Sequence, residues 1–214
     1  SAFEVQMAAC CGPWFAALLS GHGVDKGQPM VRVLELPSGN CVGNLVVASG
    51  EHITALNLCS GDYGSANSGG FLVTGMKSGS VCIWHVPGSE GPCELQCTLD
   101  GHTGAVASLA VAGNGRFLCS GSQDRTLRFW QQQQQQKRCG PTPSFDETSS
   151  VVCQDYRCTG GTPSVSCDGP WVVFVQSPRL GSWEQGASLW NLVLGKWERS
   201  FFRRNHSVHC VVLR

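Results

Sequence analysis

His102 and Asp124 are the residues of this chain whose types are best suited to chemistry. A histidine beside a carboxylate can act as a general base, because the carboxylate orients the imidazole ring and stabilises its protonated form. The same pair can instead be buried as a structural element, which requires satisfied polar groups and no access for a substrate. The strand pattern around the two residues favours the structural role.

The common catalytic and cofactor-binding motifs are missing from the sequence. It contains no GxSxG nucleophile elbow, no GxxxxGK(S/T) phosphate loop, no HExxH zinc helix and no Rossmann glycine fingerprint. The glycine-rich pieces 68–70 and 160–161 fall between expected strands, so we interpret them as turns. We therefore expect no enzymatic activity and no cofactor.

The thirteen cysteines raise the question of disulfides or zinc. Their number is odd, and Cys59, Cys82, Cys119 and Cys210 fall inside expected strands, where cysteine behaves as a small buried apolar residue. No two cysteines have the CxxC spacing that is typical of a zinc site. We therefore expect no bound metal.

The segment from Gly101 to Trp130 must position His102 and Asp124. Small and apolar residues alternate in it as in half-buried strands, and Gly-Asn-Gly and Gln-Asp-Arg supply tight turns. The expected strands are 105–111, 116–122 and 126–130, and the expected turns are 113–115 and 123–125. This pattern predicts a three-stranded antiparallel meander.

The meander resembles the WD40 repeat, the four-stranded blade of a β-propeller, whose signature is a Gly-His near its start and a Trp-Asp near its end. Here Gly101-His102 begins the unit, and a Ser-Gly-Ser at 120–122 and Asp124 follow at family spacing. Trp130-Gln131 replaces the Trp-Asp, so the signature is slightly degraded.

The resemblance implies that His102, Asp124, Trp130 and a strand serine form a buried hydrogen-bonded tetrad that stabilises the blade. We expect Ser122 to supply the hydroxyl group, with Ser120 on the same strand face as the alternative. In this setting His102 and Asp124 contribute to stability and not to catalysis.

Weaker copies of the unit are expected along the rest of the chain. We predict an all-β protein, a β-propeller of four-stranded antiparallel blades with about four blades and one extra strand. The expected third strands are Val31–Leu36, Val81–Val86, Leu127–Trp130 and Ala187–Leu192, and the expected fourth strands are Asn40–Val47, Cys93–Leu99, Ser149–Asp155 and Lys196–Phe202. The expected units are 1–49, 50–100, 101–155 with a glutamine-rich loop insertion at Gln131–Gln136, 156–204, and 205–214 as the first strand of a further blade or a ring-closing strand.

The other units depart from the pattern. His52 could replace the histidine of the second unit, which has Trp84 but carries Ser78 or Gly79 where an Asp is expected. Leu34 replaces the Trp of the first unit, and the fourth has Trp190 without an evident His or turn Asp. The third unit is thus the only one expected to build the whole tetrad.

The length of 214 residues bears on whether the ring is complete. A seven-bladed ring needs about 300 residues at about 40 to 45 per blade. We expect an incomplete propeller, either a fragment or a half-ring completed by another chain, and the alternative is a small closed ring of four or five blades.

Composition limits the partners. The formal net charge is zero and only 14% of residues are charged, so no global attraction to nucleic acid or membrane is indicated. No apolar run reaches the roughly 18 residues that span a bilayer. We expect a cytoplasmic or nuclear protein.

The resemblance implies a rigid, non-catalytic platform that brings other proteins together within a multiprotein complex.

 Loops at the ends of the sheets and the blade edges would supply the contacts. Exposed aromatic and basic loop residues contribute most to interface energies. We select Trp183, which equally well could fold back over its blade, and more weakly Arg125 and Arg128.

Two alternative functions remain open from the sequence. Basic and aromatic residues interleave near the C-terminal end, a pattern that can contact RNA phosphates and stack on bases, although the absence of net positive charge weighs against it. These residues are Arg199, Arg203, Arg204 and His206, near Trp197, Phe201 and Phe202. The other alternative is a substrate-recognition subunit of a ubiquitin ligase.

Overall fold

The described residues fold entirely into β-structure. The structure, a computed structural model, describes residues 3–21, 29–47, 50–59, 70–88, 90–112, 115, 117–131, 156–157, 164–168, 171–176, 184–191 and 196–204. These residues form four sheets of four strands, and in each sheet the strands pair antiparallel with their neighbours in chain order. The predicted fold class, an all-β protein of four-stranded antiparallel sheets, is confirmed.

The strands follow the alternation of apolar residues in the sequence. The first sheet contains β1 (Phe3–Cys11), β2 (Trp14–Gly21), β3 (Met30–Glu35) and β4 (Cys41–Val46). The second contains β5 (Ile53–Cys59), β6 (Gly70–Met76), β7 (Val81–Val86) and β8 (Glu94–Leu99). The third contains β9 (Val106–Ala112), β10 (Phe117–Ser122), β11 (Thr126–Gln131) and β12 (Tyr156–Arg157). The fourth contains β13 (Ser164–Asp168), β14 (Trp171–Gln176), β15 (Glu184–Asn191) and β16 (Lys196–Arg204).

The third sheet ends later in the sequence than we expected. Its fourth strand, β12, pairs with Thr126 and Leu127 of β11 and lies just past the predicted limit of that unit at residue 155. A strand of two residues has no alternation of its own, so only its pairing identifies it. The expected strands at 149–155 and 205–214, and residues 132–136 of the glutamine run, lie outside the described residues.

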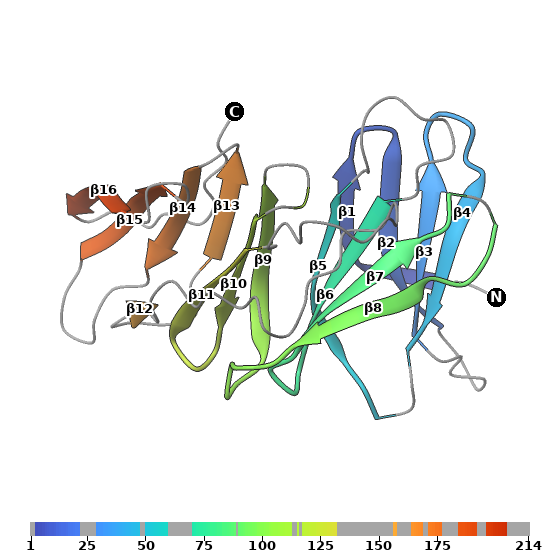
Figure 1. Ribbon diagram of the computed structural model, residues 1–214, viewed down its shortest axis with the longest axis horizontal. Helices are drawn as coiled ribbons and strands as arrows, with labels where there is room; N and C mark the ends of the chain where they lie inside the picture. Colours follow the sequence, from blue (N-terminus) through green and yellow to red (C-terminus); the bar gives the residue numbers. More distant parts are fainter. Residues whose placement is uncertain are drawn as a thin grey trace, which may run out of the picture.

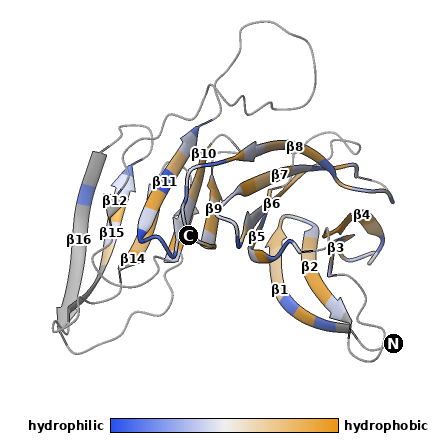
Figure 2. Cartoon of the chain, turned by 90° about the horizontal axis from the view of Figure 1, so that it is seen from below, coloured by the Kyte–Doolittle hydropathy of each residue, from blue (hydrophilic) through white to orange (hydrophobic). Residues whose placement is uncertain are grey.

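The sheets stack face to face in an arc, with the first strand of each sheet on the inner side (Figures 1 and 2). Each junction buries apolar side chains from both sheets. Trp14, Val33 and Leu72 belong to the cluster between the first and second sheets, and Ile83 and Leu118 to the next. Cys119, Leu127, Phe129, Val172, Phe174 and Trp190 fill the third junction. Packing between neighbouring sheets therefore supplies the core.

The first sheet has a second face, which points away from the second sheet. Val5, Leu19, Met30 and Val46 form a row across its four strands, one residue from each. Val5 and Val46 are 56% and 57% exposed. A parallel row consists of Cys10, Phe15, Leu34 and Cys41. Between the two rows lie Ala8, Ala17, Arg32 and Asn44, so the outward face is apolar apart from one arginine and one asparagine.

Leu34 shows how the outward face corresponds to faces in the other sheets. Leu34 pairs with Phe15 on the preceding strand, as Trp84 pairs with Leu72 and Trp130 with Leu118. Trp84 and Trp130 pack toward the sheet that precedes their own. The outward face of the first sheet is therefore equivalent to the faces that the later sheets bury.

No helix in the described part of the chain is long and apolar enough to cross a membrane.

Candidate functional site

His102 lies at the centre of a buried hydrogen-bond network in the third sheet. The residue is 7% exposed, and its side chain is fully buried. Nδ1 lies 3.0 Å from Oδ2 of Asp124 and 2.9 Å from Oγ1 of Thr126, and Nε2 lies 2.8 Å from Oγ of Ser120. The indole N–H of Trp130 donates to the same Ser120 oxygen at 2.9 Å. The network joins the loop before β9 to β10 and β11.

The donors and acceptors fix a consistent protonation pattern. Trp130 can only donate, so Ser120 accepts from it. The Asp124 carboxylate can only accept, so Nδ1 of His102 carries the proton that faces it, and in the neutral ring Nε2 accepts from the Ser120 hydroxyl. This arrangement fits a neutral imidazole whose two nitrogens are both occupied within the protein.

The prediction that Ser122 supplies the hydroxyl of the tetrad is wrong, and Ser120 supplies it. Ser122 donates to the carbonyl of Gly104 at 2.8 Å and accepts the N–H of Asp124 at 3.1 Å. The pairing of β10 with β9 shifts at Ser122, where the strand gives way to the turn. Ser122 thus holds the turn, while Ser120 remains within the regular part of the strand.

Thr126 is a member of the network that sequence reasoning missed. Its backbone N–H and its hydroxyl both donate to Oδ1 of Asp124, at 2.8 and 2.6 Å, and the N–H of Thr103 donates to Oδ2 at 2.9 Å. The signal was present in the sequence, because an Asp commonly caps the backbone two residues further on.

The network is suited to stability and not to proton transfer with a substrate. His102, Ser120 and Trp130 are all buried, and the polar atoms of the His–Asp pair are used by neighbouring groups. A general base needs a free nitrogen within reach of the proton that it removes. His102 and Asp124 therefore stabilise the third sheet.

Asp124 gives the network a dependence on pH. Burial alone would raise the pKa of its carboxyl group, but hydrogen bonds from the Thr126 hydroxyl and from the backbone N–H groups of Thr103 and Thr126, with His102 nearby, lower the pKa to about 2. A carboxyl whose pKa is lower in the folded state than in the unfolded state stabilises the fold above its unfolded pKa. That stability is lost as pH falls from about 4 towards about 2.

We expect Asp124→Asn to be destabilising near neutral pH and to differ less from wild type as the pH falls through this window. Urea denaturation of both proteins across the window measures the difference. Asp100→Asn is a suitable control, because Asp100 is exposed and outside the network. A difference for Asp124→Asn that stays constant down to the lower end of the window would contradict the assignment.

Two glycines bring the loop of His102 against its surroundings. Gly79, with φ of 101°, lies in the turn after β6, and a Cβ there would collide with the carbonyl oxygen of His102. A Cβ at Gly101 would collide with Nη1 of Arg128. A residue larger than glycine at position 101 would therefore have to displace the Arg128 guanidinium group.

The predicted partner-binding residues differ in how exposed they are in the structure. Arg125 is exposed in the turn between β10 and β11 and has φ of 67°. Arg128 is only half-exposed and packs on Gly101, so it is a poor contact residue. Trp183 and His206 lie outside the described residues, as do the side chains of the predicted RNA-contacting residues on β16.

The second sheet keeps part of the network, and the fourth sheet keeps the tryptophan without the hydroxyl residue. The indole N–H of Trp84 donates to the hydroxyl of Thr74 at 2.9 Å, as Trp130 does to Ser120. His52 is exposed, so it does not have the role in the second sheet that His102 has in the third. In the fourth sheet the position equivalent to Ser120 is Phe174, which is fully buried. Within the described ranges, the complete network occurs in the third sheet alone.

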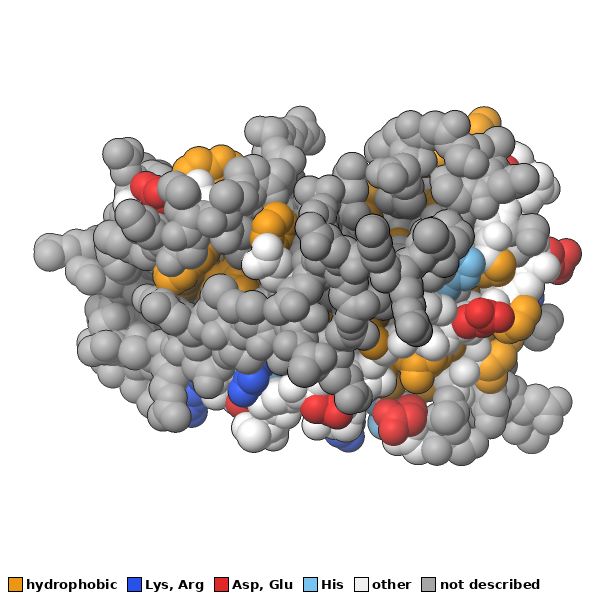
Figure 3. Space-filling model, viewed as in Figure 1, with side chains coloured by type: hydrophobic (Ala, Val, Ile, Leu, Met, Phe, Trp, Pro, Cys, Tyr) orange, Lys and Arg blue, Asp and Glu red, His pale blue; other side chains and the backbone are white. Residues whose placement is uncertain are grey.

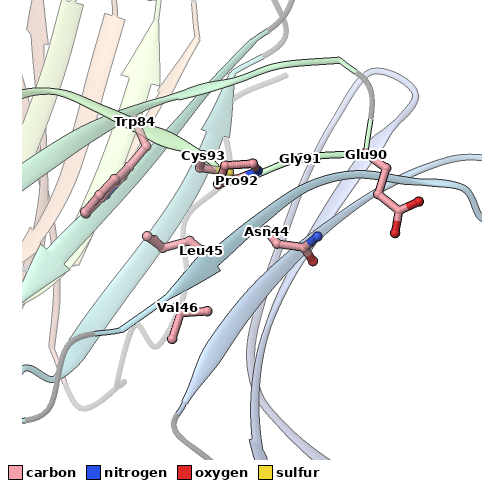
Figure 4. Close-up of a pocket in the computed structure, with 8 residues that line it drawn as sticks. All are labelled: Asn44, Leu45, Val46, Trp84, Glu90, Gly91, Pro92 and Cys93. Atoms are coloured by element: carbon pink, nitrogen blue, oxygen red, sulfur yellow. The ribbon is translucent and has the colours of Figure 1, made fainter.

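A separate groove lies between the first two sheets. One pocket of about 470 Å³ extends from β4 to the segment before β8, and a second of about 280 Å³ adjoins it. Both are lined by Leu45, Val46 and Trp84. Figure 4 shows Trp84 and Leu45 on facing sides of the first pocket, with Val46 beyond Leu45 along the strand.

Comparison with known sequences identifies one repeat family. The profile described as WD domain, G-beta repeat matches residues 93–131. Similar proteins include Small ribosomal subunit protein RACK1 of Saccharomyces cerevisiae, 35% identical over 48% of this chain and 28% of its own length. Nuclear distribution protein nudF of Aspergillus flavus is 38% identical over 33% of this chain and 14% of its length. The chain thus matches about a quarter or less of most such relatives.

Comparison with solved structures supports the same fold. A chain in the crystal structure of a mitotic checkpoint complex matches with a TM-score of 0.62 and 15% identity, over 93% of this chain and 53% of that one. The computationally designed Ika4 protein matches with a TM-score of 0.54 and 15% identity, over 88% of this chain and 91% of its own.

Proposed function

This chain belongs to the WD40-repeat family of β-propeller proteins, and we propose that it is a non-catalytic scaffold that mediates protein–protein interactions within a multiprotein complex. WD40-repeat proteins act in general as interaction platforms. A similar protein, Small ribosomal subunit protein RACK1, is by its name part of a large assembly. We also propose that the protein works in the cytoplasm or the nucleus.

The observation that carries this proposal is that the polar atoms of His102 and Asp124 are hydrogen-bonded to other groups of the protein. The residue pair best suited to catalysis is bonded to Ser120, Thr126 and the backbone of Thr103, and it thereby holds the loop before β9 to β10 and β11. A sheet fixed in this way presents its turns in one rigid geometry. Rigid presentation lowers the entropic cost of binding a partner.

Arg125 is the best described contact residue, because it projects from a turn that the network holds. Its backbone has a left-handed conformation that glycine adopts without steric cost. Arg125→Gly therefore removes the guanidinium group while the turn keeps its shape. We expect the amount of at least one co-purified protein to fall about tenfold, because exposed arginines are frequent hot spots of interfaces.

Affinity purification of the full-length gene product, followed by quantitative mass spectrometry, tests both statements. Gln123→Ala is the matched control, since Gln123 is exposed in the same turn. If wild-type protein retains no partner, the scaffold function is wrong. If partners are retained equally by wild type and Arg125→Gly, the scaffold function stands and the role of Arg125 is wrong.

A further inference from the structure

The outer edge of β4 already pairs with an extended segment of the second sheet. The N–H of Asn44 donates to the carbonyl of Gly91 at 2.8 Å, and its carbonyl accepts the N–H of Cys93 at 2.6 Å. Asn44 and Pro92 thereby form a short parallel bridge. The edge of β4 can thus accept the backbone of an extended chain.

Past this bridge the two segments diverge. The segment that contains Pro92 continues into β8, which pairs with β7, while β4 continues to Val46. Backbone groups alternate along a strand, so the N–H and C=O of Val46 point to the same edge as those of Asn44. The residues that the structure describes supply no backbone partner to Val46 on this edge. The groove opens at this point.

The walls of the groove are apolar and firmly held. Trp84 is tied to Thr74 by its indole N–H, and Leu45 is buried in the junction between the sheets. Burial, with Cys41 nearby, raises the pKa of the Cys93 thiol to about 11, so this wall residue stays neutral. Such walls favour an apolar side chain in the groove.

The charges around the groove have one sign. Glu90 lines the first pocket and Glu51 the second, and both are exposed. No lysine or arginine is among the residues that line either pocket. Figure 3 shows carboxylates and apolar side chains close together over the first and second sheets. A ligand with positive charge at its flanks is therefore favoured.

We propose that this groove binds an extended peptide segment of a partner protein, which adds to the edge of β4 as a strand, places an apolar side chain between Leu45 and Trp84, and carries Lys or Arg on its flanks. The inference rests on the proposed scaffold function and assigns it a surface distinct from the turn of Arg125. Backbone pairing supplies affinity, and the apolar pocket and the carboxylates supply specificity.

A phage-displayed library of random linear peptides, selected against the purified protein, tests the proposal. We expect the selected pool to be enriched in an apolar residue flanked by Lys or Arg. The most enriched sequence is then synthesised with a fluorescent label, and its affinity for wild type and variants is measured by fluorescence polarisation.

Paired variants separate the two parts of the interaction. Val46→Pro removes the edge N–H and is expected to weaken binding about fivefold or more. Val46→Thr keeps the N–H and is expected to bind as wild type does. Glu51→Lys with Glu90→Lys is expected to weaken binding about tenfold. Glu94→Lys reverses one charge outside the lining and is expected to change affinity by about twofold or less.

Two results would overturn the proposal. One is a selected pool without enrichment of apolar residues flanked by basic ones. The other is peptide binding that is unchanged both in Val46→Pro and in the double charge reversal. Neither result affects the scaffold function, because partner capture through Arg125 is measured independently on the full-length protein.

Discussion

His102→Ala is expected to lower the free energy of unfolding by about 2–3 kcal/mol. The substitution removes the ring that bonds Ser120, Asp124 and Thr126 at the same time. It leaves the Ser120 hydroxyl and part of the Asp124 carboxylate without this partner, and it opens a cavity at a site that is 7% exposed. A cost above that of a single hydrogen bond follows.

Urea denaturation followed by tryptophan fluorescence measures this cost. Thr103→Ala is the control, because the Thr103 side chain is exposed and its backbone N–H still donates to Asp124. The control should lie within about 0.5 kcal/mol of wild type. If His102→Ala also falls within that limit, the network is not a stabilising element.

Phe174→Ala is expected to have the largest effect of any change considered, about 3–5 kcal/mol. Phe174 is 0% exposed and lies in the cluster that joins the third and fourth sheets. Trp190 in the same cluster stacks on Phe129 with ring centroids 5.6 Å apart. A cavity next to these rings weakens the attachment of the fourth sheet to the third.

Hydrogen exchange distinguishes this local effect from general destabilisation. Amides of β14 and β15 should lose more protection in Phe174→Ala than amides of β6 and β7, because each sheet is buried mainly against its neighbours. Phe174→Leu keeps most of the side-chain volume and should cost less than about 1.5 kcal/mol. Equal loss of protection in all four sheets would show that the fold opens as one unit.

The third sheet could be predicted from sequence because its fixed residues and its strand alternation agree. Gly101-His102, Asp124 and Trp130 specify the unit, and the apolar pattern gives its strands. The choice between Ser120 and Ser122 could not be made, because both lie on the same face by simple alternation. The shift in pairing at the end of β10 separates them, and it leaves no mark in the sequence.

Features that depend on contact between distant segments were beyond sequence reasoning. Arg128 looked exposed from its place on a strand, but its packing on Gly101 brings together the two ends of the repeat. The groove beside Val46 requires the first and second sheets to meet and then diverge. The periodicity of apolar residues describes one strand at a time, so it carries no information on contacts between distant segments.

The outward face of the first sheet determines how these 214 residues behave in solution. Val5 and Val46 at the ends of its apolar row are more than half exposed, and Leu34 takes the place of tryptophans that are covered elsewhere. An apolar face of this kind gives the molecule one adhesive end. Concentrated samples are therefore expected to associate through it, to bind hydrophobic dyes while fully folded, and to disperse in mild detergent.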